Sequence, residues 1–229
     1  MNELEPTLAE IDVDGALQET AAAVTRGDFL RRAATVTAAA AAGALVTEAV
    51  AGAAVAQTAN DIAILRFDQV LEYLQAGLYT EAERLGALKP ETLAWARVVG
   101  AHERAHLQAI KLLLGEHAVK SPGFNYAGVT SDEAAFVKTA VGFEDLTAAL
   151  LKWQAPRLDS REIVAAAVSL HSVETRHAAW IRKLVGLQPA TTAFDKPASQ
   201  QKMAQLIDST HFLVSRPVTS SRKKPRYTG

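Results

Sequence analysis

The sequence has no cysteine, and this absence excludes several kinds of site at once. A disulfide framework, an iron–sulfur cluster and a thiolate zinc site all need cysteine side chains. Any bound metal ion must therefore be held by histidine and carboxylate side chains. An excess of charge of one sign is also lacking, because 24 Lys and Arg residues nearly balance 25 Asp and Glu residues. With a formal net charge of −1, we expect no nucleic acid as a partner.

Aromatic residues are scarce as well, at 6% of the 229 residues, whereas hydrophobic residues reach 49% and include many alanines. Glycine and proline fall mostly between long segments rather than inside them. Alanine has the highest helix propensity, and glycine and proline have the lowest. The composition therefore predicts an all-α chain, long enough for one domain of ordinary size with tails.

Residues 1–57 differ from the rest and predict a separate leader. After an acidic beginning, Phe29 and Leu30 are followed by Arg31-Arg32 and an apolar, Ala-rich stretch over 33–46. Small residues follow, including Ala54-Val55-Ala56, which a signal peptidase could cut. A charged start, an apolar run and a small-residue exit are typical of an export signal.

This leader resembles a twin-arginine signal. It is degenerate, because its Arg pair follows the Phe-Leu instead of preceding it. We expect export to the periplasm or cell surface, with a cytoplasmic protein that keeps a helical arm as the alternative. The apolar stretch is short and is followed closely by Glu48, so a stable membrane span is not expected.

Residues that start and stop helices predict four long helices in 58–190. The expected starts are near Asn60 or Asp61, at Pro90-Glu91, at Thr130-Ser131-Asp132-Glu133 and at Asp159-Ser160-Arg161-Glu162. The expected ends are Gly86, Gly115, the residue before Pro156, and Gly186. Proline suits a first turn, the two four-residue patterns resemble capping boxes, and glycine readily ends a helix. Each helix would be about 36 Å long.

The lengths of the connections predict the topology of the bundle. Short links join the first two helices and the last two, and short links give antiparallel hairpins. The loop from Glu116 to Thr130 could stretch to roughly 50 Å, which is enough to cross the bundle from end to end. Two hairpins joined by one long crossover form the ferritin-like topology. We expect flexible extensions at both ends.

The region 191–229 is expected to be an irregular C-terminal tail with a short helix near Gln200–Ile207. Its end, from Ser215 to Gly229, is basic. A solvated end explains so short a charged run better than a tail for an anionic partner does.

Two Glu-x-x-His motifs mark the second and fourth helices. They are Glu103-Arg104-Ala105-His106 and Glu174-Thr175-Arg176-His177. Residues three apart share one helix face, so each motif presents two metal-ligand types together. The first and third helices each carry one glutamate among apolar neighbours, Glu72 and Glu144.

Three further observations favour a metal site made by these six residues. The four glutamates lie 10 to 13 residues after the expected helix starts, so they meet at one level of an antiparallel bundle. Glu103 follows Glu72 by 31 residues and Glu174 follows Glu144 by 30, so each hairpin repeats the pattern. Four buried carboxylates without partners would be costly, and two divalent cations would neutralise them. Carboxylate and imidazole ligands suit iron or manganese.

These segments resemble the ferritin-like superfamily, and most closely its branch of exported bacterial ferritin-like and plant desiccation-related proteins. The resemblance extends over about Thr58 to Gly186 and rests on Leu71–Tyr79, Ala101–His106, Phe143–Asp145 and Val173–His177. It implies a dinuclear iron or manganese site in which Glu103 and Glu174 bridge the metals. Glu72, His106, Glu144 and His177 would be the terminal ligands. Rubrerythrin relatives add a cysteine-bound iron centre as electron donor, which this chain cannot have.

The expected function is redox chemistry at two metal ions, either ferrous iron oxidation or removal of peroxide, with oxygen or peroxide as the reacting partner. The alternative is a metal-stabilised structural or desiccation-protection protein without turnover. A bundle without metal would have to leave four mid-helix glutamates buried and unpaired or turn them all outward. The sequence is compatible with both a monomer and a homo-oligomer.

Several neighbouring residues have two interpretations. Tyr79 lies seven residues after Glu72 on the same face and could either hydrogen-bond a metal-bound oxygen or pack in the core. His171 is one turn before Glu174, and a solvated histidine is favoured over a supporting role. His102 is next to Glu103, and adjacent helix positions point apart, so we expect it at the surface. Arg104 and Arg176 are expected in exterior ion pairs. Trp95, Trp153 and Trp180 are expected in the core or at an interface.

Overall fold

The structure is a computed structural model that describes residues 57–214. The export-signal-like segment, except for residue 57, and the basic end over 215–229 lie outside these residues. The described helices are α5 (Ala59–Leu85), α6 (Pro90–Leu114), α7 (Glu133–Gln154), α8 (Arg161–Leu184) and α9 (Gln200–Thr210). No strand occurs within 57–214, where Phe124 and Leu213 form one isolated antiparallel bridge. The all-α prediction is therefore confirmed.

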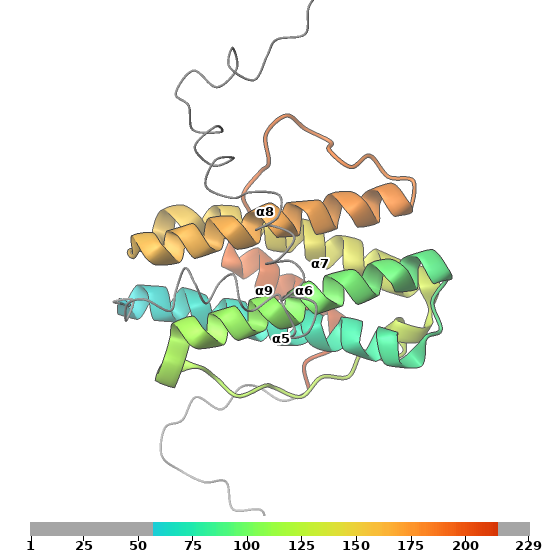
Figure 1. Ribbon diagram of the computed structural model, residues 1–229, viewed down its shortest axis with the longest axis horizontal. Coiled ribbons are helices and arrows are strands. Elements are labelled where there is room, and N and C mark those ends of the chain that lie inside the picture. The colour runs from blue at the N-terminus through green and yellow to red at the C-terminus, as the bar shows by residue number, and fades with distance from the viewer. Residues whose placement is uncertain (1–56, 215–229) are drawn as a thin grey trace, which may run out of the picture. The chain divides into compact units, whose positions relative to one another are not determined.

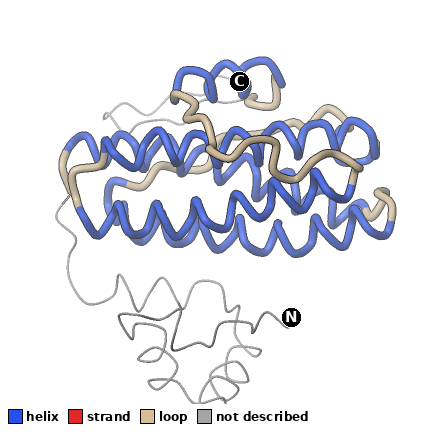
Figure 2. The backbone as a smooth tube through the Cα atoms, turned by 90° about the horizontal axis from the view of Figure 1, so that it is seen from above, coloured by secondary structure: helices blue, strands red, loops and turns tan. Residues whose placement is uncertain are grey.

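The two hairpins are α5 with α6 and α7 with α8, and each pair packs closely (Figure 1). The crossover between α6 and α7 runs along the bundle, as the loop length predicted. Figure 2 shows the helices side by side with the loops at their ends and along one side. None of the described helices combines the length and the apolar character that crossing a membrane requires.

The ends of the helices mostly follow the predicted signals, with two corrections at the start of α5 and α8. Thr58, rather than Asn60 or Asp61, caps α5: its side chain accepts a hydrogen bond from Asp61 N (3.1 Å), and Asp61 accepts one from Thr58 N (3.3 Å). Ser160, rather than Asp159, caps α8. The Asp159 carboxylate instead accepts a hydrogen bond from the Thr58 hydroxyl at 2.6 Å. Both corrections have one cause, because these residues join the starts of two helices.

The start of α7 also differs from the prediction. The helix begins two residues later than a cap at Thr130 would allow, and Asp132 caps it by accepting from Ala135 N at 2.7 Å. Thr130 belongs to a 3-10 turn (Val129–Ser131), and its hydroxyl donates to Glu81 at 2.6 Å. A contact with α5 therefore replaces the local capping box. Gly86 and Gly115 end α5 and α6 as predicted, both with positive φ.

The crossover is fixed to α5 by side chains at two places. The Gln69 side chain donates to Val119 O (3.0 Å) and accepts from Val119 N (2.8 Å). Further along, the Tyr126 hydroxyl donates to Leu74 O at 3.0 Å. A Cβ atom at Gly77 would lie 2.1 Å from that hydroxyl oxygen, so only glycine allows this approach.

The region expected to be an irregular tail contains α9, which reaches Thr210 rather than Ile207. Met203, Ile207 and Phe212 are buried in the main hydrophobic cluster. Backbone hydrogen bonds then join the chain to the crossover, from Asn125 N to Phe212 O and from Val214 N to Gly123 O. Burial of these apolar side chains explains why the segment packs on the bundle.

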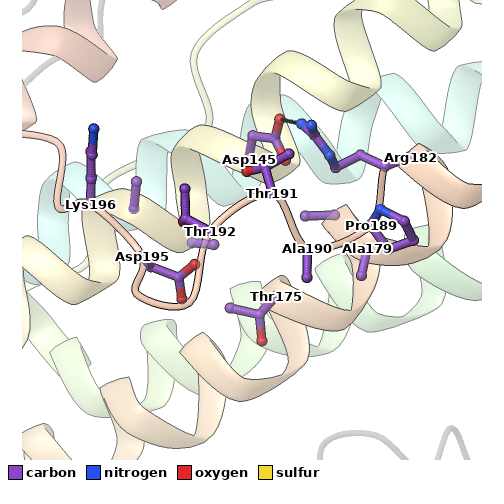
Figure 3. A pocket seen from close by; sticks show the side chains of 13 residues that line it. Asp145, Thr175, Ala179, Arg182, Pro189, Ala190, Thr191, Thr192, Asp195 and Lys196 are labelled. Carbon is purple, nitrogen blue, oxygen red and sulfur yellow. Dashed lines mark hydrogen bonds and ion pairs between the residues drawn. The ribbon is translucent and has the colours of Figure 1, made fainter. Parts of the chain in front are cut away.

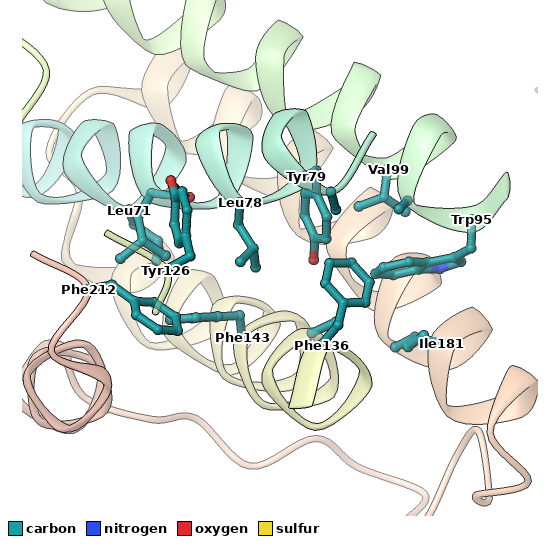
Figure 4. Packing of buried hydrophobic residues seen from close by; sticks show 14 of the residues in the cluster. Leu71, Leu78, Tyr79, Trp95, Val99, Tyr126, Phe136, Phe143, Ile181 and Phe212 are labelled. Atoms are coloured by element: carbon teal, nitrogen blue, oxygen red, sulfur yellow. Dashed lines mark hydrogen bonds between the residues drawn. The ribbon is translucent and has the colours of Figure 1, made fainter. Parts of the chain in front are cut away.

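An aromatic group fills the core at the end of the bundle near Gly86. Tyr79 contacts Trp95 and Phe136 edge-on, with ring centres 5.4 and 6.0 Å apart (Figure 4). All three side chains are fully buried. Such edge-to-face pairs are favoured by the charge distribution of aromatic rings.

Polar pairs, in contrast, join α5 to α7, and we call them the α5–α7 polar ladder. Their side chains are at most 6% exposed. Gln154 Nε2 donates to Asp68 Oδ1 at 2.7 Å, Thr147 Oγ1 donates to Gln75 Oε1 at 2.9 Å, and the Tyr79 hydroxyl donates to Glu144. The numbers rise on α5 as they fall on α7, as antiparallel helices require.

Candidate metal centre

Six ionisable side chains from four helices meet in the middle of the bundle. Glu72 comes from α5, Glu103 and His106 from α6, Glu144 from α7, and Glu174 and His177 from α8. The most exposed of them is His106 at 8%, and three of the four glutamates are completely buried. The structure thus brings together all six residues that the sequence analysis singled out.

The six side chains form two overlapping groups. Glu72, Glu103, His106 and Glu174 make the first position, and Glu103, Glu144, Glu174 and His177 make the second position. In each group the ligand atoms lie within 4.8 Å of one another. Two glutamates, Glu103 and Glu174, belong to both.

The shared glutamates divide their oxygens between the two positions. His106 Nδ1 lies 3.6 Å from Glu103 Oε2 and 2.9 Å from Glu174 Oε1. His177 Nδ1 lies 3.2 Å from Glu103 Oε1 and 3.5 Å from Glu174 Oε2. One oxygen of each shared carboxylate therefore faces each histidine. This is the arrangement that a bridging carboxylate needs.

The terminal glutamates complete the two positions. Glu72 Oε2 lies 4.0 Å from His106 Nδ1, and Glu144 Oε2 lies 3.3 Å from His177 Nδ1. Both histidines therefore turn Nδ1 toward the carboxylates.

Seven buried ligand atoms of this centre have no hydrogen-bond partner, although buried polar atoms normally have one. They are Glu72 Oε2, Glu103 Oε1, Glu144 Oε2, both carboxylate oxygens of Glu174, and Nδ1 of His106 and of His177. These atoms are close together, but their directions do not satisfy hydrogen bonds. Cations between them would satisfy them all, and oxygen with imidazole nitrogen is a suitable donor set for iron or manganese. The residues present therefore fit a two-metal site.

Without a cation, the centre balances its charge with protons. Burial raises the pKa of Glu72 well above its usual range, with further repulsion from Glu103 and Glu174. Burial also raises the pKa of Glu144 to about 8. Burial opposes a charged His106, but the nearby Glu103 and Glu174 prevail and raise its pKa to about 10.

The other histidine and the shared Glu103 follow the same logic. Burial opposes a charged His177, yet Glu103, Glu144 and Glu174 raise its pKa to about 12. Burial alone would raise the pKa of Glu103, but contacts with His106 and His177 hold it well below its usual range. The buried centre thus keeps protons where divalent cations would otherwise neutralise the carboxylates.

Hydrogen bonds from neighbouring side chains hold two of the carboxylates. The Tyr79 hydroxyl donates to Glu144 Oε1. Burial, followed by the charge of Glu144, raises the pKa of Tyr79 well above its usual range, so the hydroxyl keeps its proton. Tyr79 is therefore both a core residue and a donor to a carboxylate. Gln75 Nε2 donates to Glu103 Oε2 at 3.3 Å, and Thr147 in turn donates to Gln75.

His102 is not a surface residue, which corrects the prediction from the sequence. Its Nδ1 lies 2.8 Å from His177 Nε2, and the side chain is partly buried. Burial and the nearby His177 and His106 lower the pKa of His102 below its usual value. The prediction considered α6 alone. His102 does point away from Glu103, but the side of α6 that carries it faces α8. The sequence signal for its position was its spacing of four residues from His106, because residues four apart lie on the same side of a helix.

The remaining candidates lie outside the centre. His171 makes none of the centre's contacts, and its Nε2 atom is buried without a partner. Arg104 forms the expected exterior ion pair, 2.9 Å from Glu83. Trp95 is in the core as expected, whereas Trp180 is 45% exposed. Trp153 lies under the guanidinium of Arg157.

A separate cavity of about 560 Å³ lies between α7, α8 and the segment that precedes α9 (Figure 3). Asp145 and Arg182 form an ion pair in its wall, and Thr175, Asp195 and Lys196 also line it. None of the six residues of the metal centre does so.

Comparison with protein families identifies the family of this chain. Residues 60–187 match the model of a ferritin-like domain. These limits include α5 from its second residue, all of α6 to α8, and the whole centre. A comparison with curated proteins found no match.

Proposed function

Because this chain belongs to the ferritin-like domain family, we propose that its bundle binds two metal ions, iron or manganese, between the six buried side chains. The supporting observation is the convergence of seven buried, unpartnered ligand atoms on two adjoining points. Two divalent cations would balance four carboxylates, and such a neutral cluster is compatible with an apolar core.

The proposed ligand roles follow the way in which the carboxylates are shared. Glu103 and Glu174 would bridge the two metals, since each presents one oxygen to each histidine. Glu72 and His106 would complete the first position, and Glu144 and His177 the second.

The proposed activity is oxidation of ferrous iron or removal of peroxide. The bound metal pair would supply the electron transfer, which no side chain in the centre can perform alone. The protein would orient the ligands, exclude bulk water by burying all six side chains, and keep a hydroxyl proton on Tyr79 beside Glu144. With no cysteine in the chain, the electrons would come from the metal substrate or from a separate donor.

The second candidate is a metal-stabilised structural or stress-protection protein without turnover. The deep burial of all six residues favours it, because a closed centre restricts access for oxygen or peroxide. The two functions share the same metal site, so metal content must be measured before activity.

The first experiment is elemental analysis of the full-length protein after anaerobic loading with ferrous or manganous ion. Wild type should hold about two metal ions per chain, and Glu103→Ala should hold almost none while staying helical by circular dichroism. Glu91→Gln is the matched control, because Glu91 is an exposed glutamate on the same helix. A wild type that binds no metal after loading would refute the proposal. If metal is bound, oxygen and peroxide consumption then separates the enzyme from the structural protein.

A further inference from the structure

We propose that His102 is the positioning residue for His177, holding that ring so that its Nδ1 faces the second metal position. This inference rests on the proposed function, since it assigns a supporting role at the same site. The residue lies on α6, whereas His177 lies on α8, so the contact also joins the two hairpins at the level of the centre.

The geometry of the two rings is that of an in-plane hydrogen bond. His102 Nδ1 and His177 Nε2 are 2.8 Å apart, the ring centres are 5.1 Å apart, and the planes differ by 18°. The distance between centres equals the nitrogen–nitrogen distance plus the two ring radii. The two nitrogens therefore lie on the line between the centres, and the rings meet edge to edge rather than face to face.

This contact selects the form of His177 that a metal ion needs. A ligating Nδ1 must offer its lone pair, so the ring proton must be on Nε2. That N–H then donates to His102 Nδ1, and the proton of His102 is on its own Nε2. Histidine ligands of metals usually donate their second N–H to a carboxylate, a carbonyl or water. Here an imidazole takes that place.

No other side chain takes this role in the described part of the molecule. Nδ1 of His177 faces Glu103, Glu144 and Glu174, and within residues 57–214 the hydrogen-bonding partner of its Nε2 is His102. A side chain at 102 that cannot accept a hydrogen bond would leave the His177 ring free to turn and its N–H without a partner.

The test compares two variants of nearly equal size in the full-length protein. His102→Asn keeps an acceptor near the place of Nδ1, whereas His102→Leu has a similar shape and no acceptor. The probe is cobaltous ion, titrated in competition with a chelator. Its visible absorption reports ligand geometry independently of turnover. Circular dichroism confirms folding, and His102→Ala replaces the leucine variant if that protein does not fold.

Wild type should bind two cobaltous ions. The leucine variant should bind one of them about 10- to 100-fold more weakly with an altered absorption spectrum, in line with losses of such supporting contacts. The asparagine variant should stay close to wild type in both measurements. Equal behaviour of all three proteins would overturn the role of His102 while leaving the two-metal site intact. Equal weakening of both variants would show a packing effect and would also overturn it. A wild type without bound cobalt would instead refute the proposed function itself.

Discussion

The first and second metal positions have the same kinds of ligand but different surroundings. At the second position, Tyr79 donates to Glu144 and His102 contacts His177. At the first position, Glu72 and His106 make no hydrogen bond to a residue outside the centre within residues 57–214. Both supporting residues of the second position come from the first hairpin.

The sequence repeat explains why the second hairpin provides no equivalent support to the first position. Tyr79 follows Glu72 by seven residues, and the corresponding residue after Glu144 is Leu151. His102 precedes Glu103, and the corresponding residue before Glu174 is Val173. Both counterparts are apolar, so their side chains can neither donate nor accept a hydrogen bond. The repeat thus duplicates the ligands without duplicating their support, and we expect the second position to be the more rigid of the two.

The largest expected effect distinguishes shared ligands from terminal ones. Glu174→Gln should reduce bound metal from about two ions per chain to almost none, because the carboxylate faces both histidines. Glu144→Gln should remove only the ion at the second position. Elemental analysis after anaerobic loading measures both. One ion retained by Glu174→Gln would contradict the sharing of this carboxylate.

Metal removal should destabilise the whole bundle and loosen the first position most. At a metal concentration of a hundred times the dissociation constant, binding stabilises the folded protein by about 3 kcal/mol. Chelation should therefore lower the thermal midpoint, and hydrogen exchange should rise more around Glu72 than around Glu144. Glu103→Ala is the control, since the same chelator should leave its midpoint unchanged. Equal hydrogen exchange around Glu72 and Glu144 would contradict the expectation that the second position is the more rigid.

Asp68, one turn before Glu72 on α5, adds a pH-dependent cost of burial beside the first position. Burial raises its pKa from 3.8 to about 7, so the folded metal-free protein holds this proton more tightly than the unfolded chain does. Stability therefore falls as the pH rises from about 4 to about 7, and the cost is fully present above that range.

Asp68→Asn should remove this cost and raise the free energy of unfolding by about 1–3 kcal/mol at pH 8. The gain should fade to nothing near pH 4, where the aspartate is protonated in both states. Urea unfolding of the metal-free protein across this range measures the effect. Asp195→Asn, at an exposed position, serves as control. A gain independent of pH would point to packing rather than to ionisation.

The smallest expected effect tests the hydrogen bond from Tyr79. Tyr79→Phe keeps the aromatic packing but removes the donor to Glu144, and should weaken metal binding at the second position about tenfold. The first position should keep its affinity. Tyr73→Phe is a matched control, because the Tyr73 hydroxyl donates to Val119 O, away from the centre. Equal weakening at both positions would show that Tyr79 acts through the bundle as a whole.

Much of the fold could be predicted because the signals are local. Gly86 and Gly115 end their helices where expected, and the crossover length indicated the topology. The meeting of Glu72, Glu103, Glu144 and Glu174 followed from their mid-helix positions and the repeat. What could not be predicted depends on contacts between elements. Asp159 and Ser160 are both good caps, and only the neighbouring start of α5 decides between them.

The supporting residues were harder to find for a related reason. Gln75 and Thr147 are ordinary polar residues until α5 and α7 are placed side by side. His102 was assigned to the surface by considering α6 alone, whereas α8 covers that side of the helix. Periodicity shows which face of a helix is buried, but the flanks of that face depend on the neighbouring helix.

The α5–α7 polar ladder has a consequence for how the protein is assembled. A purely apolar seam between two helices can slide by one turn at little cost, since one leucine replaces another. Sliding here would separate Asp68 from Gln154 and Gln75 from Thr147 and leave buried groups without partners. The side chains of the α5–α7 polar ladder thus align the two hairpins, and this alignment brings the four glutamates to the same level of the bundle. The metal-free protein therefore folds with its ligands already aligned for the metal ions.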